Sequence, residues 1–117
     1  MINRVFTQTL TFSTTTSSVL RMNSEHVLLA IRVPAGFTDC ALTFESSMAD
    51  TQTADASITD WAAVFTDGGS EYTVTVDADA GEARLFVLTA NVIGNFVRLI
   101  SSASQTLSVV AYYKGIE

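Results

Sequence analysis

The spacing of apolar residues constrains the fold of this chain most strongly, because they recur at every second position in one segment after another. In "EYTVTV", Tyr72, Val74 and Val76 alternate with polar residues, and "RVFTQTLTFST" alternates in the same way. Successive side chains of a β-strand point to opposite faces of a sheet, so this period places one face in the core and a threonine-rich face in water. No segment has the spacing of an amphipathic helix. The pattern predicts an all-β protein.

Turn sequences divide the chain into eight or nine short strands, at the spacing of a β-sandwich or barrel. The longest loop is expected at the polar segment Asp50–Thr59. With 117 residues, no repeat and no linker, the sequence predicts one domain over residues 1–117, an antiparallel, jelly-roll-like β-sandwich. The expected strands are 4–14, 18–22, 26–34, 38–48, 61–65, 71–76, 84–92, 96–101 and 106–113.

The N-terminal segment, residues 1–18, has two interpretations. Its threonine- and serine-rich stretch "TFSTTTSS" fits an arm that becomes ordered on contact with a partner. It equally fits an extended strand followed by a turn, since threonine is common on the solvent face of a sheet.

Charge and composition exclude several partners. Twelve Asp and Glu residues against six Lys and Arg give a net charge of −6, which argues against nucleic acid and against an anionic membrane surface. Charged residues make up only 15% of the chain, against about 25% in typical domains, so part of the surface is expected in an interface. The N-terminus lacks the apolar core of a signal peptide, which predicts synthesis in the host cytoplasm without export.

No pattern of catalytic residues is present, and the sequence predicts a protein that is not an enzyme and needs no cofactor. His26 is the only histidine, and no recognisable nucleophile motif accompanies it. A hydrogen-bonding role at the start of a strand is its expected one. Cys40 is the only cysteine, and its place in an alternating run favours a buried thiol.

The acidic turn "DADAGE" has two interpretations, a calcium-binding loop and a solvated hairpin turn. Asp77, Asp79 and Glu82 are alternate carboxylates around a glycine, and calcium prefers oxygen ligands. The glycine comes one place too early for an EF-hand loop, and Leu88 stands where that loop has its glutamate. The turn therefore favours a solvated hairpin, as does Asp67 with the two glycines after it, and no metal is predicted.

Trp61 decides between two kinds of β-sandwich. Its apolar run "WAAVF" favours a tryptophan in the core or between the sheets. A Trp61 exposed beside free carboxylates would instead favour a carbohydrate-binding module, in which sugars stack on aromatic rings.

The closing strand suggests an interface. Val110, Tyr112 and Tyr113 stand in it, and Arg98 lies in the strand before it; these four residues are the predicted interface. A chain with one lysine and one proline has few means of protecting exposed strand edges. Either a neighbouring chain completes the last strand, or that strand lies in the middle of its own sandwich with only one tyrosine exposed.

The stretch "LTFESSMADTQTADASITDWAAVFTDGGSEYTVTV" and the later "NFVRLISSASQTLSVVAYYKGIE" resemble small virion proteins of tailed phages. The resemblance covers Leu42–Lys114. It implies a capsid decoration (cement) protein or a tail-associated component, and no active site. Related sandwiches also occur as carbohydrate-binding and discoidin-like modules.

From these points the sequence predicts a structural protein of the virion. Its expected partners are further copies of itself, with a trimer favoured, and the major capsid protein or another virion protein. The alternative function is a carbohydrate-binding or adhesion module of a tail or fibre.

Overall fold

The computed structural model describes residues 4–23, 25–77 and 81–115, and these contain ten β-strands and one short 3-10 helix. The all-β prediction is therefore confirmed. The additional strand arises because the segment 4–14 is two strands, with the chain changing sheet at Thr11. The elements are β1 (Val5–Leu10), β2 (Phe12–Ser17), β3 (Leu20–Arg21), β4 (His26–Val33), β5 (Cys40–Ser47), η1 (Asp55–Ser57), β6 (Ala62–Ala63), β7 (Thr73–Val76), β8 (Arg84–Ile93), β9 (Phe96–Gln105) and β10 (Val109–Gly115).

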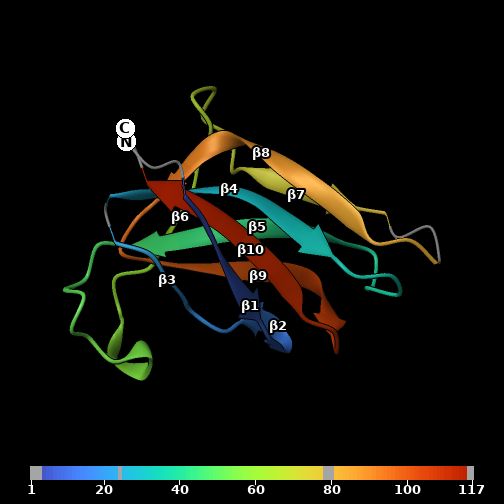
Figure 1. Cartoon of the computed structure of the whole chain (residues 1–117), viewed down its shortest axis with the longest axis horizontal. Coiled ribbons are helices and arrows are strands. Elements are labelled where there is room, and N and C mark those ends of the chain that lie inside the picture. Colours follow the sequence, from blue (N-terminus) through green and yellow to red (C-terminus); the bar gives the residue numbers. More distant parts are fainter. Residues whose placement is uncertain (1–3, 24, 78–80, 116–117) are drawn as a thin grey trace.

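The strands form two antiparallel sheets (Figure 1). The four-stranded sheet has the order β1-β10-β4-β8, and the second sheet has the order β2-β9-β5-β6, with β3 added beside β9 and β7 beside β5. The chain crosses between the sheets from β1 to β2, from β3 through β4 to β5, and from β7 through β8 and β9 to β10. Strands from the two ends of the chain thus become neighbours, which is the double Greek key of a jelly roll.

The core lies between the two sheets and follows the alternation in the sequence. Most strands contribute every second side chain, as in β5, where Leu42 and Phe44 are fully buried, whereas the two-residue β6 is exposed. Ile31 and Val109 from the first sheet and Leu99 from the second are equally buried. A fully buried side chain of this size contributes roughly 1.5–3 kcal/mol. The sequence pattern therefore specifies both the strands and the face that each strand buries.

Two side chains link the sheets along their sides. On one side, the amide of Gln8 on β1 donates to the carbonyl of Val19 at 2.9 Å and accepts from the N–H of Arg21 at 3.3 Å. On the other side, the N–H of Thr89 on β8 donates to the hydroxyl of Tyr72 at 3.0 Å. These bonds satisfy backbone groups at the outer strands, where the ladder of a sheet ends.

The segment Asp50–Thr59 is a loop, as predicted, with η1 as its only regular element. Arg21 holds it in place, because its guanidinium donates to the carbonyls of Thr51 and Thr53 and pairs with Asp55. The same guanidinium lies 4.9 Å from the centroid of the Phe96 ring.

Strand pairing decides between the two interpretations of the N-terminal segment, and likewise between the two interpretations of the closing strand. Residues 5–17 form β1 and β2, which pair with β10 and β9, so this part of the N-terminal segment is strand and not arm. β10 lies between β1 and β4. The last strand is therefore completed within its own chain.

Candidate functional site

The outer side of the four-stranded sheet is an unusually apolar surface, which we call the apolar face. Paired residues of neighbouring strands lie on the same side of a sheet, so the strand register places twelve outward residues in three rows. Eight of these twelve residues are apolar or aromatic. The rows are Thr9–Val110–Arg32–Leu85, Thr7–Tyr112–Ala30–Val87 and Val5–Lys114–Val27–Ile93.

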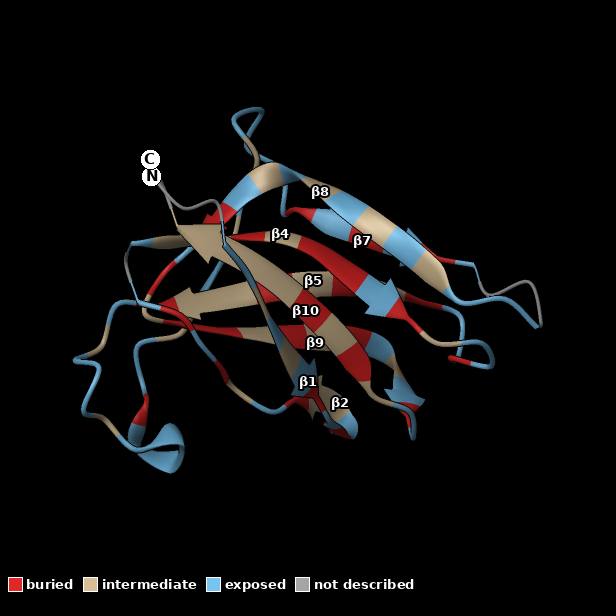
Figure 2. Ribbon diagram, viewed as in Figure 1, coloured by how far each residue is buried: buried red, intermediate tan, exposed pale blue. Residues whose placement is uncertain are grey.

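Four large aliphatic side chains of this face are strongly exposed. Val87 is 70% exposed, Leu85 59%, Val5 51% and Ile93 46%. Figure 2 shows β8 as alternating exposed and half-buried residues, because its outward side chains have nothing packed on them. Exposed apolar residues scattered singly are normal, but a contiguous patch marks an interaction site.

The charge of the apolar face differs from that of the whole chain. Arg32 and Lys114 are its only charged members, so it holds two of the six cations and none of the twelve carboxylates. They lie in the first and third rows, while Tyr112, Ala30 and Val87 fill the middle row. The face therefore has an apolar centre with an aromatic ring and charges toward two ends, which is the usual anatomy of a protein interface.

The four predicted interface residues do not form one surface. Val110 and Tyr112 lie on the apolar face, whereas Tyr113 points inward and stacks on Phe6 at 5.5 Å between ring centroids. Arg98 lies on the outer side of the other sheet, where it is paired with Glu45. Sequence reasoning missed Leu85, Val87 and Ile93. The unbroken apolar run "LFVL" after Arg84 in β8 was the available signal, because a strand that is apolar on both faces is usually covered on both.

The prediction that Trp61 lies in the core or between the sheets is wrong. Trp61 is half-buried, and the guanidinium of Arg98 lies 4.3 Å from the centroid of its ring. Ala62 and Ala63 form a two-residue strand at the edge of the second sheet and are exposed, while Val64 packs partly buried against the core. Because side chains of a strand alternate, Trp61 lies on the same side as Ala63 and not on the side of Val64. The carboxylates nearby are not free: Glu45 accepts from Arg98, and Asp60 accepts from Ser47.

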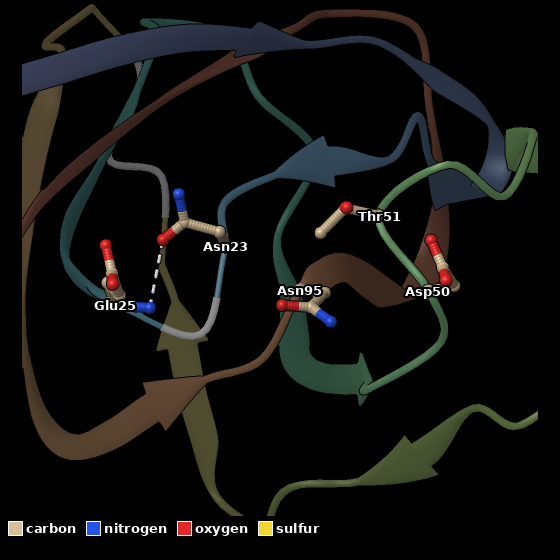
Figure 3. A pocket seen from close by; sticks show the side chains of 5 residues that line it. All are labelled: Asn23, Glu25, Asp50, Thr51 and Asn95. Atoms are coloured by element: carbon tan, nitrogen blue, oxygen red, sulfur yellow. Dashed lines mark hydrogen bonds between the residues drawn. The ribbon is translucent and has the colours of Figure 1, made fainter.

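A polar hollow of about 450 Å³ lies at one end of the sandwich (Figure 3). Its walls come from three connections: the one before β4, the loop after β5 and the turn between β8 and β9. In Figure 3 the amide of Asn95 lies between Asn23 and Glu25 on one side and Asp50 and Thr51 on the other. The hollow therefore offers carboxylate, amide and hydroxyl groups.

Most of these polar side chains already hold the loops together. The amide of Asn95 donates to the carbonyl of Ala49 at 2.9 Å, and Oδ1 of Asn23 accepts from the N–H of Glu25 at 2.9 Å. Nδ1 of His26 lies 2.7 Å from that same oxygen. His26 thus has the hydrogen-bonding role expected of it. The groups that line the hollow can supply hydrogen bonds to a bound polar molecule.

The remaining sequence candidates are dispersed. Cys40 is buried, as predicted, and burial raises the pKa of its thiol. Asp77 and Glu82 are exposed, and Asp79, the third carboxylate of the acidic turn, lies outside the described residues. Among the described residues, no three Asp, Glu, His or Cys side chains are grouped to hold a metal ion. The described part of the chain also has no helix with the length and apolarity to cross a membrane.

Comparisons with protein-family models, curated proteins and solved structures gave no match to this chain.

Proposed function

We propose that this chain is a non-enzymatic structural component of a phage virion, a capsid decoration protein that acts through self-association and through contacts with the shell. One observation carries the proposal: the apolar face has four strongly exposed aliphatic side chains, and none of its twelve residues is a carboxylate. Such a surface is suited to burial against another protein, and a chain whose role is assembly needs no catalytic centre.

The architecture supports the same proposal by analogy. Jelly rolls occur in viral capsid proteins and in lectins. Because one fold serves many functions, this analogy adds weight only to what the apolar face already indicates. The resemblance of Leu42–Lys114 to small phage virion proteins points in the same direction.

The proposed mechanism is the addition of buried surface at the joints of a shell. Each copy contributes apolar area that leaves water on docking, at roughly 25 cal/mol per Å². Many copies on one particle multiply this gain. The protein would stabilise the shell without any change in its own covalent chemistry.

Immunogold labelling of phage particles tests the proposal. An antiserum against the purified chain is applied to particles of the phage that encodes it, and gold label is counted in electron micrographs. We expect label distributed over the capsid. Label confined to the tail would move the protein to a tail-associated position, and particles without label would refute a virion role. Pre-absorption of the antiserum with purified chain provides the control.

The polar hollow favours one alternative, a carbohydrate-binding or adhesion module. Carboxylates and amides such as Glu25, Asp50 and Asn95 are groups that bind sugar hydroxyls. The ring of Phe96, beside this hollow, is buried, so no exposed aromatic platform accompanies them. A glycan array with the wild-type chain and Asn95→Ala tests the alternative: binding that the substitution abolishes would support it.

A further inference from the structure

We propose that the apolar face docks against the same face of a second copy of this chain, which gives a two-fold symmetric dimer. The inference rests on the proposed function, because that function depends on the apolar face and the inference names the partner of this face. It also changes the expected oligomer. A contact between the same face of two copies is isologous, and such a contact closes as a dimer rather than as the trimer favoured from the sequence, which leaves the other surfaces of the dimer for the shell.

The size of the face matches this occupant. Taken over their whole length, the four strands β1, β10, β4 and β8, spaced about 4.8 Å apart with about 3.3 Å per residue, cover roughly 500 Å². Two such faces bury roughly 1,000 Å², which is the lower limit for a specific protein interface. Such a contact predicts a reversible dimer that dissociates on dilution.

Charge also favours this pairing. Two copies, each with a net charge of −6, repel one another when their acidic surfaces approach. The twelve residues of the apolar face include no carboxylate. Contact through this face therefore keeps the acidic groups of both copies at a distance.

The arrangement of the rows fixes how two copies can meet. The two cations of the face lie in different outer rows, Arg32 with Leu85 and Lys114 with Ile93, whereas the middle row is Thr7, Tyr112, Ala30 and Val87. A two-fold axis along the middle row superposes the apolar centres of two copies and brings Arg32 of each copy near Lys114 of the other, so both long side chains have to extend to solvent at the rim. Tyr112 then lies centrally, as aromatic anchors do in interfaces.

Edge-to-edge pairing through β8 is the weaker alternative. The register between β4 and β8 is interrupted between Leu28 and Ala30, where four residues of β8 lie between partners that are two residues apart on β4. Bulges of this kind bend a strand and protect an edge from pairing with another chain. The outer face has no such protection.

Light scattering after size-exclusion chromatography, over a dilution series, tests the proposal. We expect twice the 12.5 kDa of one chain at high concentration and a return toward 12.5 kDa on dilution. Val87→Glu places a charge in the buried centre and is expected to weaken association about 100-fold or more. Because Val87 is 70% exposed in the single chain, this variant should fold. Val87→Thr, which keeps the β-branched shape, should weaken association less.

Thr75→Glu is the matched control, since Thr75 is exposed on β7 of the opposite sheet and the substitution adds the same charge. It should leave the dimer intact. A wild-type chain that stays monomeric at every concentration overturns the proposal, as does a Val87→Glu variant that dimerises like wild type. A trimeric mass also overturns it. If the chain is monomeric in solution and the antiserum labels capsids, the dimer is wrong and the virion role stands. If the chain is dimeric in solution and the particles carry no label, the dimer stands and the virion role is wrong.

Discussion

The guanidinium of Arg98 on β9 lies 4.3 Å from the centroid of the Trp61 ring, and its Nε donates to Glu45 at 2.7 Å. One arginine thus joins β9, β5 and the residue before β6 on the outer side of the second sheet. The cation attracts the electrons of the ring, and the carboxylate fixes the plane of the guanidinium. This contact explains why the only tryptophan is half-buried at the surface and not in the core.

Arg98→Ala should expose Trp61 and lower stability by about 1–2 kcal/mol, because the cation–π contact and the ion pair are lost together. Acrylamide quenching of tryptophan fluorescence measures the exposure, and urea unfolding measures the stability. Arg32→Ala, on the opposite sheet, should leave the quenching unchanged. Equal quenching of wild type and Arg98→Ala would contradict the stacked geometry.

Tyr72→Phe should cost about 1–2 kcal/mol in the free energy of unfolding. The substitution keeps the ring, which stacks on Phe44 at 5.4 Å between centroids, but removes the hydroxyl that accepts from the N–H of Thr89. A partly buried N–H then has no acceptor. Tyr113→Phe is the control, since no hydrogen bond of its hydroxyl occurs among the described residues. If both variants unfold at the same urea concentration, the hydrogen bond between Tyr72 and Thr89 contributes nothing to stability.

Gly94→Ala should destabilise the chain by at least about 2 kcal/mol. Gly94 has φ +147°, and a Cβ there would lie 3.1 Å from Cβ of Ser46 and 3.2 Å from the carbonyl oxygens of Ser47 and Phe96. Three close contacts around the turn between β8 and β9, two of them with backbone oxygens, force the neighbouring atoms to shift by a few tenths of an ångström, and the positive φ adds strain for a residue with a side chain. Gly68→Ala, whose nearest neighbour would be 3.8 Å away, should be nearly neutral in thermal unfolding. Similar melting temperatures for the two variants would refute the steric argument.

Cys40 should make the fold less stable at high pH. Burial raises the pKa of this thiol, and Asp39 raises it further, while hydrogen bonds with Ser101 and Gln105 lower it. The unfolded thiol ionises first, so the stabilising contribution is complete below the ordinary thiol pKa and is lost as pH rises through the folded pKa. Urea unfolding at pH values of about 7 and 10 should show a larger loss for wild type than for Cys40→Ala. An equal loss of unfolding free energy in wild type and Cys40→Ala would contradict the raised pKa of the Cys40 thiol.

The sequence by itself determined the class of the fold and the inner faces of the strands. The alternation of Tyr72, Val74 and Val76, or of Cys40, Leu42 and Phe44, predicts which side chains are buried, because side-chain direction in a strand depends only on local backbone geometry. The burial of Cys40, the loop at Asp50–Thr59 and the surface role of His26 follow from equally local features.

Tertiary structure alone decided which strands are neighbours, and with that the candidate site. Val5, Lys114, Val27 and Ile93 share a row because β1, β10, β4 and β8 pair across almost the whole length of the chain. No local rule fixes such pairing. The same long-range order placed Tyr112 beside Thr7, stacked Tyr113 on Phe6, and put Arg98 on the opposite sheet beside Trp61. Residues close in sequence were separated, and the apolar face was assembled from both ends of the chain.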